Sequence, residues 1–179
     1  MKALIAYYSR RGENLVDGSV KPLRVGNTEW LAAILRRLTG ADCFQIQQLE
    51  PYSENYYRCM DQARQDLLRN ERPQLKNLPD SIEPYKVIYL GYPNYWGTMP
   101  AAVFTFLEQF DFTGKVIKPF CTHEGSGMGR SERDLRRVCP TAVIAPGLPV
   151  RGTDVQYRLA AVENWICESV NNTKHRKEV

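Results

Sequence analysis

Short apolar runs that alternate with helical patterns constrain the fold of this chain more than any other feature. The first run, MKALIAYY at 1–8, has the aliphatic and aromatic content of a strand buried on both faces. Similar patterns predict further strands over 42–49, 85–93, 115–123 and 141–148, and helices over 27–39, 54–70, 100–110, 131–138 and 154–170. This alternation predicts an α/β fold with a parallel sheet covered by helices on both faces. Right-handed crossovers restrict such a sheet to the doubly wound type.

The helical patterns also predict which side chains are buried. The first helix is expected to bury one face, to begin at a capping Asn or Thr, and to end before Gly40. The residues expected on buried faces are Trp30, Leu31, Ile34, Leu35 and Leu38 in the first helix, Tyr56, Met60, Ala63 and Leu67 in the second, and Leu159, Val162 and Ile166 in the last.

Length and composition indicate a single domain over 1–170, followed by a polar, disordered tail over 171–179. With 43% hydrophobic and 25% charged residues, and no apolar run near the ~20 residues that span a bilayer, we expect a soluble protein without membrane insertion. The first residues have one lysine and too short an apolar run for a signal peptide, which favours a cytoplasmic location. Five cysteines without a Cys-x-x-Cys pair predict reduced, mostly buried thiols. A net charge of +4 without a basic stripe argues against nucleic-acid binding.

Two phosphate-binding patterns follow the first strand, where one would suffice. SRRGEN offers the Ser9 hydroxyl, a turn at Gly12 and the Asn14 amide. GNTE offers Asn27 and Thr28 at the start of the first helix, where free backbone amides attract anions.

Between the two patterns, Asp17-Gly18 is a hairpin-turn signal and Pro22 excludes a helix, so we expect a small hairpin. The hairpin would return the chain to a composite site, in which Ser9 and the turn at 10–14 bind one side of a phosphate and Asn27 and Thr28 bind the other. The alternative is an ordinary surface turn followed by a helix cap at Asn27.

Two further loops follow the third and fourth strands, which end at the same edge of the predicted sheet. GYPNYWGTMP presents Tyr92, Tyr95 and Trp96 from a turn shaped by proline and glycine, which suits a flat aromatic ligand. CTHEGSGMGRS contains three glycines whose amides can approach a ligand closely. The alternative is that the aromatic residues only cap the core at the edge of the sheet.

His123 and Glu124 are the only acid–base candidates in these loops, and His123 could equally be a hydrogen-bonded residue at the end of a strand. We expect no metal site. The absence of Gly-x-Gly-x-x-Gly after the first strand and of a P-loop motif excludes classical dinucleotide and triphosphate binding. Cys121 and Arg130 are too far apart in sequence for a cysteine phosphatase loop, and the third strand ends without the aspartate of a response regulator.

Together, the three loops resemble those of the flavodoxin family, and the resemblance covers nearly the whole chain. YYSRRGEN and GNTE resemble the family's phosphate loop split in two, PNYWGTMPAAVFTFLEQFDFTGK resembles its flavin-flanking loop and following helix, and PFCTHEGSGMG resembles its third flavin contact. The resemblance implies a flavodoxin-like five-stranded sheet in the order 2-1-3-4-5, of the short type, and FMN as the cofactor.

The resemblance also implies which residues bind FMN. Trp96 is slightly favoured over Tyr95 to stack on the isoalloxazine ring. The implied residues are Ser9, Arg11, Asn14, Asn27 and Thr28 around the phosphate, Pro93, Asn94, Tyr95, Trp96 and Gly97 on one side of the ring, and Thr122, His123, Glu124, Gly125 and Gly127 on the other.

Three functions fit this resemblance. The first is an electron carrier that exchanges electrons with a reductase and an acceptor protein. The second is an FMN-dependent NAD(P)H quinone or nitro-compound reductase, in which Arg10, Arg11, Lys21 or Arg24 attracts the nicotinamide cofactor and His123 donates a proton. The third is a flavin-binding module without redox activity. The weakly basic charge departs from the strongly acidic character of typical flavodoxins.

Overall fold

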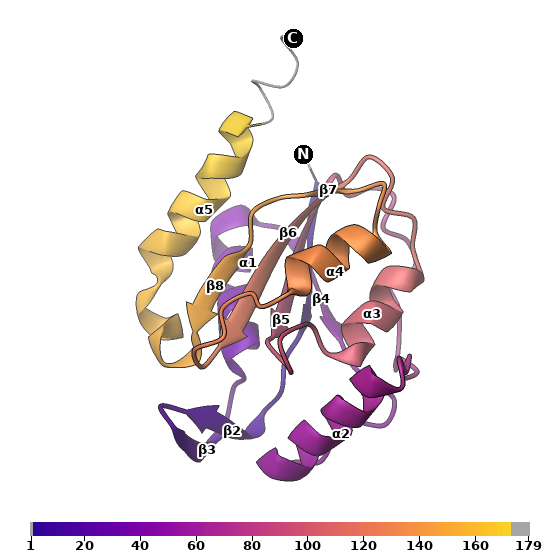
Figure 1. Cartoon of the computed structure of the whole chain (residues 1–179). Helices are drawn as coiled ribbons and strands as arrows, with labels where there is room; N and C mark the ends of the chain where they lie inside the picture. Colours follow the sequence, from indigo (N-terminus) through magenta and orange to yellow (C-terminus); the bar gives the residue numbers. More distant parts are fainter. Residues whose placement is uncertain (1, 173–179) are drawn as a thin grey trace.

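The computed structural model of the chain describes residues 2–172, and its strands form one parallel sheet with an attached hairpin (Figure 1). The strand order is β4-β1-β5-β6, and β7 and β8 both pair with the outer side of β6. This order confirms the predicted doubly wound sheet. The strands of the sheet are β1 (Ala3–Tyr8), β4 (Asp42–Ile46), β5 (Val87–Pro93), β6 (Val116–His123), β7 (Val143–Ile144) and β8 (Leu148–Arg151).

The fifth position of the sheet is divided, although a single strand over 141–148 was predicted. Ile117 of β6 is in register with Ile144, whereas Phe120 is in register with Leu148, so the outer strand carries one extra residue. Pro146 lies in this interruption, and it lacks the N–H that a continuous ladder needs. The division lets β8 continue along the carboxyl end of β6.

Helices cover both faces of the sheet (Figure 1). Along β1, Leu4 and Ala6 belong to the core under one set of helices, and Ile5 and Tyr7 belong to the core under the other, as strand alternation requires. The first set is α2 (Tyr56–Leu68), α3 (Ala101–Glu108) and α4 (Ser131–Val138), and the second is α1 (Asn27–Thr39) and α5 (Leu159–Asn172).

Several details of the helices differ from the predictions. Trp30 is 43% exposed and Leu38 is 36% exposed, because the buried face of α1 is centred on Leu31 and Leu35. The last predicted helix is divided into a 3-10 helix η1 (Gly152–Tyr157) and α5.

The predicted tail over 171–179 begins inside α5, which extends to Asn172, and 173–179 lie outside the described residues. All five cysteines are free thiols, of which Cys43 and Cys167 are exposed. Within residues 2–172, no helix has the length and apolar character needed to cross a membrane.

Candidate functional site

A cavity of about 520 Å³ lies at the carboxyl ends of the central strands, where doubly wound sheets bind ligands. The loops after β1, β5 and β6 reach it together, as predicted. The residues that line it are Ser9, Arg10, Asn14, Leu15, Asn27, Thr28, Tyr56, Tyr57, Met60, Pro93, Asn94, Tyr95, Trp96, Gly97, Thr122, His123, Glu124 and Ser126.

Three of the sequence-predicted site residues do not line the cavity. Arg11 is exposed and forms an ion pair with Glu29, with 2.7 Å between Nη2 and Oε1. Gly125 donates its N–H to Nδ1 of His123 at 2.9 Å, and the Gly127 carbonyl accepts from another loop residue. The two glycines therefore help to shape the loop that carries His123.

The two halves of the divided loop meet at the start of α1. Gly26 is the N-cap residue, and Ser9 Oγ accepts a hydrogen bond from the Glu29 amide at 3.1 Å. The expected cap by Asn27 or Thr28 is therefore wrong, because Ser9 supplies it from another segment. A Cβ atom at position 26 would lie 2.2 Å from Ser9 Oγ, so only glycine permits this approach. The two preceding amides of α1, those of Asn27 and Thr28, form no hydrogen bond within residues 2–172 and stay available to an anion.

Hydroxyl groups extend this end of the cavity. Thr28 and Thr122 form a buried pair with 2.8 Å between their Oγ1 atoms. One of the two hydroxyl hydrogens joins the pair, and the other is free to serve a ligand oxygen. Asn14 differs, because its Nδ2 donates to the carbonyls of Arg10 and Gly12 at 3.3 and 3.0 Å. Its amide hydrogens hold the loop, which leaves only an acceptor oxygen for the cavity.

The predicted hairpin is confirmed, and it joins separate parts of the site. It consists of β2 (Gly12–Val16) and β3 (Ser19–Leu23), with Asp17 and Gly18 in the left-handed region at φ 51° and 75°. At its tip, the Asp17 amide donates to Glu124 Oε2 at 3.2 Å, and Arg151 Nη2 lies 3.3 Å from Asp17 Oδ1. At its base, Glu13 Oε2 accepts from the Tyr56 amide at 2.8 Å, which fixes the start of α2.

Arg10 ties the hairpin to the loop before α2. Its guanidinium donates to the backbone carbonyls of Glu13, Ser53 and Glu54. These bonds use the guanidinium within the protein, as the ion pair with Glu29 does for Arg11. Two of the four cationic residues expected to attract a nicotinamide cofactor, Arg10 and Arg11, are thus engaged by neighbouring groups.

The aromatic loop after β5 divides its residues between the core and the cavity. Tyr95 is only 6% exposed, and its ring packs edge-on against Tyr8 with 6.3 Å between centroids. Trp96 is 48% exposed, its Nε1 donates to the Met60 carbonyl at 2.8 Å, and Arg64 Cζ lies 5.1 Å from its ring centroid. Asn94 holds the loop by accepting from the Gly97 amide at 2.9 Å. Trp96 is therefore the aromatic residue of this loop that is accessible for stacking.

The start of α2 supplies cavity residues that sequence reasoning assigned elsewhere. The sequence predicts Tyr56 and Met60 in the core and makes no prediction for Tyr57, yet all three line the cavity. Their rings and thioether add apolar surface opposite the loops. The available signal was position: α2 begins after β4, so its start lies at the same edge of the parallel sheet as the other loops.

His123 and Glu124 carry the titratable groups of the third loop. Because His123 Nδ1 accepts from the Gly125 amide, the ring proton is placed on Nε2. Burial lowers the pKa of His123, which keeps the ring neutral near pH 7. Glu124 Oε1 is buried and has no hydrogen-bond partner within residues 2–172. A buried carboxylate oxygen of this kind needs a donor, and a ligand hydroxyl group would satisfy it.

Comparisons with known proteins agree with this arrangement. A family model described as Flavodoxin matches residues 23–169. Among curated protein sequences, no significant match was found.

Three solved structures with the same fold extend the comparison. A chain of Bacteroides uniformis described as a flavoprotein shares 24% identity, with 92% of this chain and 97% of that chain covered and a TM-score of 0.72. A flavoprotein of Lactobacillus acidophilus in complex with FMN shares 19% identity, with 92% and 97% covered and a TM-score of 0.66. The apo form of an NADH:FMN oxidoreductase shares 12% identity, with 92% and 88% covered and a TM-score of 0.50. At such identities, the likeness shows the fold. Because the family match spans most of the chain, this protein belongs to the flavodoxin family, whose cofactor is FMN.

Proposed function

We propose that this protein binds FMN in the 520 Å³ cavity and carries electrons between a reductase and an acceptor protein. The observation that carries the proposal is that the two ends of this cavity differ in chemistry. One end combines the Ser9 hydroxyl with the first amides of α1, as a phosphate requires, and the other presents the exposed Trp96 ring. These are the two ends of a flavin nucleotide.

The groups between these ends also fit FMN. The unpartnered Oε1 of Glu124 would accept a hydrogen bond from a ribityl hydroxyl, and the free hydrogen of the Thr28–Thr122 pair would serve a phosphate oxygen. Asn14 would act by holding the phosphate loop in shape, because its amide hydrogens are used there. The remaining predicted residues of the aromatic and glycine-rich loops would flank the ring.

Bound FMN supplies reversible electron transfer, and the protein supplies binding, orientation and electrostatics. Trp96 and the start of α2 would exclude water from the ring. The neutral His123 ring would offer its Nε2 proton as a hydrogen-bond donor, since its Nδ1 is occupied by the Gly125 amide. No residue in this scheme must act as a catalytic acid.

The carrier function is favoured over an NAD(P)H-dependent reductase because the cationic side chains near the cavity are either engaged by other groups or lie outside it. Arg10 is bound to three backbone carbonyls and Arg11 to Glu29, so neither is available to the phosphates of a nicotinamide cofactor. Lys21 and Arg24 are exposed and do not line the cavity. We place the carrier in the cytoplasm, with a reductase and an acceptor protein as its partners.

The test begins with the visible absorption spectrum of the purified protein titrated with FMN. Under anaerobic conditions, NADPH is added first alone and then with a separate flavoprotein reductase. We expect bleaching of the flavin only when the reductase is present. Absence of FMN binding refutes the proposal, and bleaching by NADPH alone identifies a reductase. Flavin that even dithionite cannot reduce would indicate a binding module without redox function.

A further inference from the structure

A second cavity carries an excess of positive charge that the proposed function does not use. Its volume is about 320 Å³, and its lining comes from the end of α2 and the residues after it, from α3, and from the length of α4. We call it the arginine cleft, after the four guanidinium groups of Arg72, Arg130, Arg133 and Arg137 that line it. The one acidic residue in its lining is Asp134.

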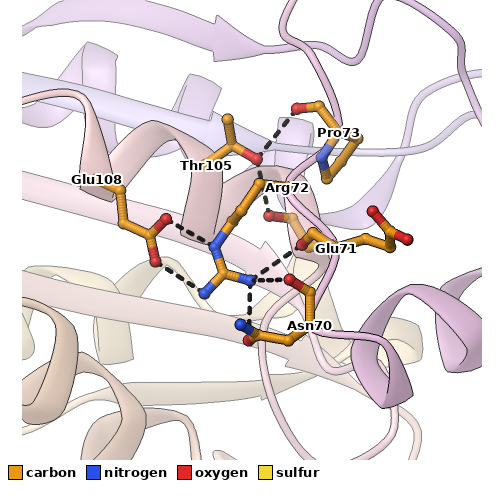
Figure 2. Close-up of polar contacts among 7 residues, drawn as sticks. Asn70, Glu71, Arg72, Pro73, Thr105 and Glu108 are labelled. Atoms are coloured by element: carbon orange, nitrogen blue, oxygen red, sulfur yellow. Dashed lines mark hydrogen bonds and ion pairs between the residues drawn. The ribbon is translucent and has the colours of Figure 1, made fainter.

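Arg72 is held rigidly on one side of the cleft (Figure 2). Its Nε and Nη2 donate to the two carboxylate oxygens of Glu108 at 2.7 and 2.8 Å, and its Nη1 donates to the Asn70 and Glu71 carbonyls. The Cζ atom lies 5.2 Å from the centroid of the Phe104 ring. The guanidinium is therefore fixed before any ligand arrives, although 27% of the side chain is exposed.

Asp134 is satisfied by neighbouring groups and does not cancel the remaining charge. Its Oδ2 accepts from Thr98 Oγ1 at 2.7 Å and lies 3.3 Å from Arg130 Nε. Arg137 stands farther away, with 3.9 Å between Nη2 and Oδ1. Arg133 is exposed, and its side chain forms no hydrogen bond or ion pair with any residue in 2–172. The cleft thus keeps about one full unpaired positive charge and a second that is loosely paired.

We propose that the arginine cleft binds the phosphate group of a phosphorylated small molecule or free phosphate. Guanidinium groups match phosphate oxygens in charge and in fork geometry, and those of Arg133 and Arg137 are unpaired or only loosely paired. Arg72 already uses its fork on Glu108, so it adds a fixed wall to the cleft. The volume suits a phosphate with at most a small attached group. A concave site with fixed walls favours such a ligand over the flat acidic surface of another protein.

The cleft is joined to the larger cavity by a single turn. The Arg130 amide donates to the Gly97 carbonyl at 2.7 Å, and Arg130 Nη1 donates to the Trp96 carbonyl at 3.2 Å. Trp96 and Gly97 line the larger cavity, whereas Thr98 lines the cleft. An anion that draws on Arg130 would therefore act on the turn that carries Trp96. The anion site itself does not depend on FMN binding.

The test is isothermal titration calorimetry on the full chain, with and without FMN, using inorganic phosphate and ribose 5-phosphate as probes. The cleft variant is Arg133→Ala with Arg137→Ala. The matched control is Arg36→Ala with Arg37→Ala, which removes the same charge from exposed positions at the end of α1 on the opposite face of the sheet. Circular dichroism checks that both variants fold.

We expect saturable binding to the wild type, at least tenfold weaker binding to the cleft variant, and no more than a twofold change in the control. Tighter binding of ribose 5-phosphate than of phosphate would identify a phosphorylated small molecule as the source, and equal affinities would identify free phosphate. The proposal is overturned if the wild type shows no saturable heat, or if both variants weaken equally. Phosphate binding without FMN binding would refute the proposed flavin function alone.

Discussion

At the scale of single residues, Trp96 combines exposure with an unusual backbone conformation. Its φ of 53° lies in the left-handed region, which costs a non-glycine residue about 1 kcal/mol or more. The Met60 carbonyl and the Arg64 guanidinium hold the indole in place. Such conformations persist where the surrounding structure enforces them, and they cluster at ligand sites. The strain therefore supports a role for the Trp96 ring in binding.

We predict that Trp96→Ala raises the dissociation constant for FMN about tenfold or more, because stacking on an aromatic side chain contributes ~1–3 kcal/mol. Quenching of FMN fluorescence on titration measures this constant. Trp30→Ala is the control, since Trp30 is similarly exposed at 43% but does not line the cavity. Equal affinities for the two variants would exclude Trp96 as the stacking residue.

Lys118 provides a second residue-scale prediction, on stability. It is 2% exposed, and its Nζ donates to the Trp165 backbone carbonyl at 2.9 Å. The same Nζ lies 4.5 Å from the centroid of the Trp165 ring. Burial lowers the pKa of Lys118 from 10.5 to about 8. Between these two values the unfolded chain keeps the proton that the folded chain has lost, so the contribution of Lys118 to stability should rise with pH from about 8 to 10.5.

Urea unfolding at several pH values tests this expectation against Lys118→Met. The quantity compared is the difference in the free energy of unfolding between wild type and variant, in which the titration of the tyrosines and thiols that both proteins share cancels. We expect this difference to shift in favour of the wild type by about 3 kcal/mol across the window, since the two pKa values, 10.5 and about 8, differ by about 2.5 and one pKa unit corresponds to ~1.4 kcal/mol. A difference that does not change with pH would show that Lys118 titrates normally.

At the scale of elements, the β2–β3 hairpin can be shortened without disturbing its base. Replacing 15–20 by Asn-Gly removes two cross-strand pairs, so Asn14 and Lys21, which already face each other, would flank a new two-residue turn. The change keeps the bond from Glu13 to α2 and removes Leu15 and the contacts of Asp17 with Glu124 and Arg151.

We predict that this shortened hairpin leaves the melting temperature within a few degrees, because exposed ion pairs stabilise little. FMN should dissociate about tenfold faster, since the partly buried Leu15 side chain contributes on the order of 1.4 kcal/mol to the cavity wall. Stopped-flow release of FMN into excess apoflavodoxin of another source measures the rate. An unchanged rate would show that the hairpin tip does not retain the cofactor.

The elements that could be predicted from sequence are those fixed by local patterns. The apolar run of β1 and the Asp17-Gly18 turn each determine their own structure, and the loops at one edge follow from the parallel sheet. The bond from Ser9 to the Glu29 amide links residues 20 positions apart, and no local pattern shows it. The break at Pro146 was missed for a similar reason, since its effect depends on which neighbour the strand pairs with.

At the scale of the whole molecule, the net charge of +4 determines how salt should affect electron transfer. A positive protein attracts anionic reactants, and salt screens this attraction with a Debye length of ~8 Å at physiological ionic strength. The dithionite-reduced holoprotein should therefore be oxidised by ferricyanide more slowly as salt rises, and by hexaammineruthenium(III) more quickly. Stopped-flow absorbance measures both rates.

Arg36→Glu with Arg37→Glu separates the overall charge from the local field, because it brings the formal net charge to zero at positions that do not line the cavity. If the overall charge governs approach, both salt dependences should nearly vanish in this variant. If they persist unchanged, the field around the cavity governs instead, and the wild type's charge would say nothing about its partners. The expectation would be contradicted outright if, in the wild type, salt made oxidation by ferricyanide faster and oxidation by hexaammineruthenium(III) slower. If the two rates depend on salt as expected in the wild type, and this dependence vanishes in the variant, the protein is adapted to acidic electron-transfer partners, in contrast to the acidic flavodoxins.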